Sequence, residues 1–75
     1  MKLQDREIML DRLQAIVLQK ACEIQYEEGL LPDAAAILAL EAIEDEFCKE
    51  CPEYSAFYRV NSVKILDVVY YILDN

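Results

Sequence analysis

The sequence predicts an all-α protein: a compact three-helix domain over residues 1–75, built from a helical hairpin and a third helix, which dimerisation could complete. Apolar residues recur every three or four positions through most of the chain, the spacing of amphipathic helices. Gly29, Pro32 and Pro52 are the only glycine and prolines, and such residues mark helix ends. A chain of 75 residues leaves room for a single domain.

The first helix is expected over about residues 3–28. Its apolar stripe consists of Leu3, Leu10, Leu13, Val17 and Ile24, widened by Ile16 and Ala21. Gly29 follows directly, and glycine is the residue that most easily adopts the left-handed conformation that ends a helix.

The second helix is expected from Pro32 to about Glu50. Proline suits a first turn, where its missing N–H has no partner in any case, and Asp33 suits the positive helix start. The main stripe consists of Ala36, Leu40, Ile43, Phe47 and Cys51, and the opposite flank carries Ala35, Leu38, Ala39 and Ala42. A helix that is apolar on both sides is normally buried, so we expect this one at the centre of the fold or of a dimer.

The third segment, about residues 53–74, is expected to be helical, with Tyr54, Phe57, Tyr58, Ile65, Val68, Val69 and Ile72 on one stripe. Asn61 falls within that stripe and needs a hydrogen-bond partner if buried. A break near residues 60–62 is an alternative, with Asn61 or Ser62 capping the final helix. Valine and tyrosine also favour strands, so a strand over residues 64–73, paired with a second copy, stays open.

The apolar content predicts association with another chain. A domain of this size buries only about 60% of the surface that its unfolded chain exposes, yet 56% of its residues are hydrophobic. Leftover apolar side chains commonly mark interfaces, and we expect a homodimer. The expected contact residues are Val60, Val63, Tyr70 and Tyr71 on the outer face of the third segment, Ala35, Ala39 and Ala42 on the alanine flank, and Glu41 and Asp45.

Charge is distributed unevenly along the chain. The net charge is −8, and residues 26–53 hold nine acids against one base. Phosphates repel such a surface, so direct nucleic-acid binding is not expected. The simplest interpretation is that the acids keep an apolar protein in solution. The alternative is an acidic mimic that blocks a nucleic-acid-binding protein.

The cysteines suggest a further alternative, a metal or redox module formed by Cys22, Cys48 and Cys51. However, Cys48 and Cys51 form their C-x-x-C near the expected end of a helix, where the dipole disfavours thiolates. Zinc needs about four nitrogen or sulfur ligands, and the chain has no histidine. We therefore expect Cys51, and with it Cys22, to be a small core residue, Cys48 to be incidental, and no metal or cofactor to be bound. An odd number of cysteines also indicates a reducing compartment, here the cytoplasm.

Nothing in the sequence predicts catalysis. Histidine, the commonest general acid–base group, is missing, and a single glycine cannot form a glycine-rich phosphate loop. The charged start is unlike a signal peptide, and no apolar run approaches the ~20 residues that span a bilayer. We expect a non-enzymatic regulator, inhibitor, immunity-like or antitoxin-like factor, or adaptor that contacts a protein and binds no membrane or small-molecule substrate.

Overall fold

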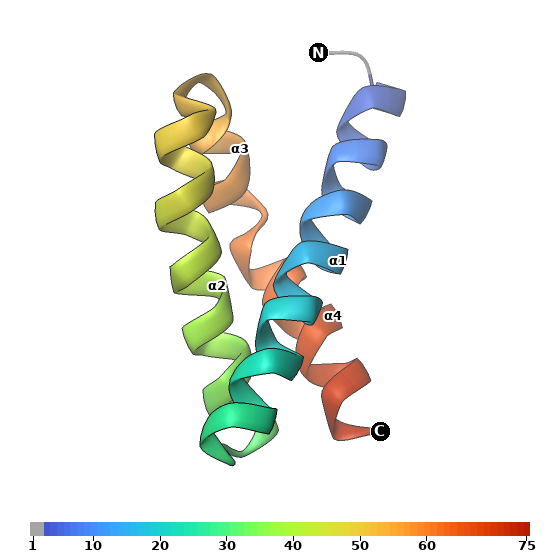
Figure 1. Ribbon diagram of the computed structural model, residues 1–75. Coiled ribbons are helices and arrows are strands. Elements are labelled where there is room, and N and C mark those ends of the chain that lie inside the picture. The colour runs from blue at the N-terminus through green and yellow to red at the C-terminus, as the bar shows by residue number, and fades with distance from the viewer. Residues whose placement is uncertain (1–2) are drawn as a thin grey trace.

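The computed structural model describes residues 3–75, with side chains described from Asp5 onward, and is all-α (Figure 1). Its elements are α1 (Leu3–Glu28), α2 (Pro32–Glu50), a 3₁₀ turn η1 (Pro52–Tyr54), α3 (Ser55–Val60) and α4 (Ser62–Asp74). Residues 3–75 contain no strand. The predicted fold class is therefore confirmed, and the alternative of a strand over residues 64–73 is wrong.

The helices form a hairpin against which the third segment packs. α1 and α2 run antiparallel, and α3 and α4 return alongside them (Figure 1). α2 packs against every other helical element, so its predicted central position in the protomer is confirmed. The body is only 15 Å across its thinnest direction. A helix in so thin a body keeps one open side, and the exposed side chains of Ile37 and Leu38 lie there.

The ends of the hairpin helices follow the local chemistry of the sequence. Gly29 adopts φ 66°, and its N–H donates to the Gln25 carbonyl at 2.8 Å. A residue with a Cβ would be strained at that φ. α2 begins at Pro32 and ends at Glu50, one residue before the pre-proline position. Both predicted helix ends are confirmed.

Asn61 divides the third segment into α3 and α4, as one of the two sequence alternatives predicts. Its side-chain Nδ2 donates to the Phe57 carbonyl at 2.9 Å. The hydroxyl of Ser62 donates to the Arg59 carbonyl at 2.8 Å. Both side chains therefore donate to carbonyl groups in the last turn of α3, and the Phe57 carbonyl also accepts the Asn61 backbone N–H at 3.2 Å. Asn61 holds the predicted N-cap position of α4, but its side chain makes no capping hydrogen bond there.

The core lies where α1, α2 and the third segment meet. Its fully buried side chains are Leu13, Val17, Ala21, Ala35, Ala36, Ala39, Tyr58, Ile65 and Val69, and Ile43 is nearly so. Ile16, which the sequence places in the stripe of α1, is 47% exposed, so that part of the prediction is wrong. Leu3 lies outside the residues whose side chains are described.

Candidate protein-contact surfaces

An open cleft separates the first turns of α1 from η1 and α3. Among the described residues, no Cα of α1 comes within 8 Å of a Cα in η1 or α3, whereas α1 packs closely on α2 and α4. The resulting space measures about 780 Å³. We call it the α1–α3 cleft. This end of the protein therefore has a hollow that opens to solvent and exposes apolar side chains.

The walls of the α1–α3 cleft are apolar and its charged residues balance. The apolar lining residues are Leu10, Tyr54, Ala56, Phe57 and Val60, and the polar ones are Arg6, Glu7, Glu53, Asn61 and Lys64. All four charged residues are exposed. Two bases and two acids sum to zero, in a chain whose net charge is −8.

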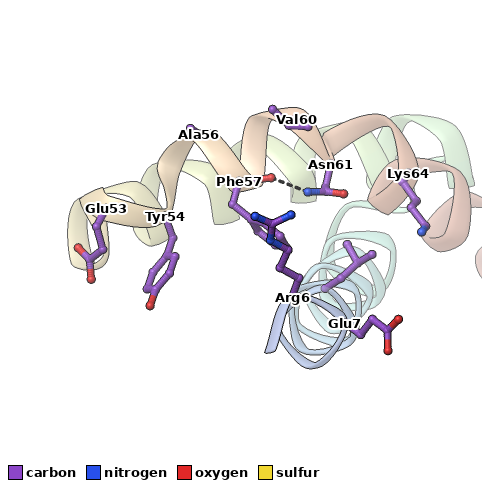
Figure 2. A pocket seen from close by; sticks show the side chains of 10 residues that line it. Arg6, Glu7, Glu53, Tyr54, Ala56, Phe57, Val60, Asn61 and Lys64 are labelled. Carbon is purple, nitrogen blue, oxygen red and sulfur yellow. Dashed lines mark hydrogen bonds between the residues drawn. The ribbon is translucent and has the colours of Figure 1, made fainter. Parts of the chain in front are cut away.

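The side chains of the α1–α3 cleft differ in direction (Figure 2). Arg6 extends from α1 toward Phe57, and Tyr54 projects from η1 on the side of α1. Val60 and Ala56 lie on the side of α3 that faces away from α1. The cleft therefore opens between α1 and η1, and Val60 and Ala56 form its outer rim on α3.

A second, smaller hollow lies between the start of α2 and α4, and we call it the α2–α4 groove. It measures about 240 Å³ and is lined by Asp33, Ile37, Leu66, Asp67 and Tyr70. Three of these residues are apolar or aromatic and two are acidic, and none is basic. Sequence reasoning missed Ile37 and Leu66, because the register between α2 and α4 cannot be read from the spacing within either helix.

The four residues of the third segment that are expected at a protein contact are all exposed. Val60, Val63, Tyr70 and Tyr71 have exposed fractions of 82%, 68%, 41% and 70%. Successive helical positions turn by about 100°, which explains why the adjacent tyrosines cannot both face the core. Val60 lines the α1–α3 cleft, and Tyr70 lines the α2–α4 groove.

The alanine flank lies inside the protomer, which corrects the expectation that it meets a partner. Ala35 and Ala39 are fully buried and Ala42 is half-buried. α2 makes its most extensive packing with α1, and small side chains permit that close approach. Ala35 and Ala39 therefore fill the core and are closed to a partner.

Glu41 and Asp45 are exposed on α2. Asp45 borders a shallow hollow of about 440 Å³ with Glu44, Cys48, Lys49 and Arg59. In this hollow the Arg59 Nε donates to the Glu44 Oε1 at 3.2 Å, and the arginine side chain is 67% exposed. An ion pair so exposed contributes at most about 1 kcal/mol to stability, so it does not by itself indicate a binding site.

The cysteines are all free thiols. Cys22 is exposed on α1, and Cys48 and Cys51 are half-buried at the end of α2. The predicted core position is therefore wrong for Cys22 and only partly met by Cys51, which is half-buried. Within the described residues, no three cysteine, aspartate or glutamate side chains form a group that could hold a metal ion.

Tyr58 is a titratable group in the core. Its side chain is fully buried, and its hydroxyl donates to the Leu40 carbonyl at 2.6 Å. Burial, followed by the charges of Glu44 and Cys48, raises the pKa of Tyr58 well above its usual range. The ring also packs against Phe47, with centroids 5.7 Å apart. These contacts assign Tyr58 to the core.

No family model, curated protein or solved structure matches this chain. None of the helices in residues 3–75 is both long enough and apolar enough to cross a bilayer.

Proposed function

We propose that this protein acts without catalysis, by contacting other protein chains, and that it self-associates through the α1–α3 cleft. It would serve as a regulator, inhibitor, immunity-like or antitoxin-like factor, or adaptor. The observation that carries the proposal is the exposure of Val60 at 82% beside an open, apolar-walled cleft. Exposed apolar surface of this kind is typical of interfaces.

Charge favours the cleft as the place where two copies meet. A chain of net charge −8 repels a second copy over most of its surface. The two bases and two acids of the α1–α3 cleft cancel, so this repulsion is locally weakest there. In a two-fold dimer, the arginine and lysine of one copy can also face the glutamates of the other. Burial of the apolar walls would then supply the attraction.

The same cleft is poorly suited to acid–base chemistry. Arg6, Glu7, Glu53 and Lys64 are all exposed, whereas catalytic groups are usually tuned by burial or by close charges. Together with three free cysteines, this supports a binding role in a reducing compartment, which we propose to be the cytoplasm.

Sedimentation equilibrium over a range of protein concentrations tests self-association. We expect a dimer whose dissociation constant rises at least tenfold in Val60→Glu, since a partner that covers the outer rim of α3 would bury the new carboxylate, which is costly without a paired charge, and tenfold corresponds to about 1.4 kcal/mol. Tyr26→Glu is the matched control, because Tyr26 is 92% exposed and lies outside the cleft. A monomer at every concentration, or equal weakening by both variants, would refute the cleft dimer.

A further inference from the structure

We infer that the α2–α4 groove binds an amphipathic, basic helix of a partner protein. This inference rests on the proposed role in protein contact, and it names the chemistry of that partner. It does not depend on self-association, because the groove and the α1–α3 cleft have no lining residue in common.

The shape of the groove suits a helix. α2 and α4 run antiparallel side by side (Figure 1). Leu66 and Tyr70 from α4 and Ile37 from α2 supply its apolar lining. Val63, which is 68% exposed, lies one helical turn before Leu66 and extends the same apolar strip. Grooves between helices bind amphipathic helices through anchors at three- and four-residue spacing.

The negative charge of the groove favours a basic partner. Asp33 and Asp67 line it without a basic residue, and Asp74 is exposed two turns beyond Asp67. Asp33 already accepts the Ala34 N–H at 2.8 Å, so Asp67 is the better placed of the two carboxylates to bind a basic group of a partner. Lys64, the base nearest in sequence, lines the α1–α3 cleft instead. Lysine or arginine beside an apolar stripe would complement this arrangement.

A second copy of this chain fits the groove poorly. In a two-fold interface the same patch meets itself, so the aspartates of one copy would approach those of the other. Like charges facing each other oppose association. Removal of Asp67 would then strengthen self-association, whereas for a basic partner it weakens binding.

A designed peptide serves as the probe. It is a labelled helix of about 18 residues, long enough for about five turns, with a leucine stripe flanked by lysines. Its twin carries glutamate at every lysine position. We expect the lysine peptide to bind at near-physiological salt and the glutamate twin to bind at least tenfold more weakly, as measured by fluorescence anisotropy.

Three variants locate the binding. Tyr70→Ala should weaken binding of the lysine peptide about tenfold, because aromatic anchors dominate such interfaces. Asp67→Asn should weaken it about threefold, as expected for a charge at an exposed rim. Asp45→Asn removes the same charge from an exposed position on α2 outside the groove. We expect its effect on the affinity for the lysine peptide to be less than half of the effect of Asp67→Asn.

The outcomes separate this inference from the proposed cleft dimer. Binding that persists in Val60→Glu and is lost in Tyr70→Ala supports a groove that works independently of self-association. Equal weakening by Asp67→Asn and Asp45→Asn would show only diffuse attraction to an acidic protein and overturn the inference. Equal binding of the glutamate twin would overturn it as well, and so would self-association that Asp67→Asn strengthens and Asp45→Asn does not.

Discussion

The two ends of this helical protein are packed differently. At the end that holds the α1–α2 turn, Val17 and Ala21 of α1, Ala35 of α2 and Val69 of α4 are fully buried. At the other end, the first turns of α1 approach neither η1 nor α3, and no described residue of α1 before Leu13 is fully buried. We call the end that holds the α1–α2 turn the closed end, and the end that holds the α1–α3 cleft the open end.

The difference follows from side-chain size and from helix length. Alanines on α2 let α1 and α4 come close at the closed end, and a close-packed interior stabilises the fold. Toward the open end the large side chains of Phe47, Tyr54 and Phe57 are only half-buried. α4 ends its path at the closed end (Figure 1), so mainly η1 and the short α3 face the first turns of α1. We conclude that stability resides at the closed end and that the open end is available for contact.

The largest effect on stability should come from Ile65→Ala in the closed core. Ile65 is fully buried, and truncation of such a residue costs about 2–5 kcal/mol. A domain of 75 residues is stable by roughly 4–11 kcal/mol, so this change could unfold much of the population. Urea denaturation followed by circular dichroism measures the loss.

Leu10→Ala at the open end is the matched comparison. Leu10 is only half-buried and lines the α1–α3 cleft, so less apolar burial is lost, and we expect about 1.5 kcal/mol or less. Similar losses of unfolding free energy in Ile65→Ala and Leu10→Ala would show that both ends are equally well packed. The open end would then not be distinguished as a contact surface.

A smaller effect, with a distinct pH dependence, is expected for Tyr58→Phe, at the junction of the two ends. Loss of the hydrogen bond from the Tyr58 hydroxyl to the Leu40 carbonyl should cost about 1 kcal/mol at neutral pH. Burial raises the pKa of Tyr58 in the folded protein, whereas an unfolded tyrosine ionises near pH 10. The unfolded chain therefore loses its proton first as pH rises.

The stabilising contribution of Tyr58 is therefore complete below about pH 10 and declines above it. The difference in unfolding free energy between the wild type and Tyr58→Phe should narrow from that pH upward. Urea titrations at pH 8, 9, 10 and 10.5 measure it. A constant difference across this range would mean that the Tyr58 hydroxyl ionises as freely in the folded protein as in the unfolded chain.

Much of the fold was predictable from the sequence, because helix periodicity and the punctuation at Gly29, Pro32 and Pro52 are local signals. The exposure of Val60, Val63, Tyr70 and Tyr71 was also predictable, since each lies off the main stripe of its segment. The burial of Ala35 and Ala39 was not, because an alanine flank can meet a helix of the same protomer or of a partner. The α1–α3 cleft and the α2–α4 groove depend on the angles between helices, which cannot be read from the spacing of residues within one helix.

The smallest effect is expected from replacing all three cysteines. Cys22 is exposed near the closed end, and Cys48 and Cys51 are half-buried near the open end. Substitution of Cys22, Cys48 and Cys51 by serine should lower the unfolding free energy by about 1 kcal/mol or less, since surface changes usually cost within ±0.5 kcal/mol. Elemental analysis of the purified wild type should find no stoichiometric zinc. Bound metal, together with unfolding of the triple variant, would instead show that the thiols hold a structural ion and would return the cysteine module to consideration.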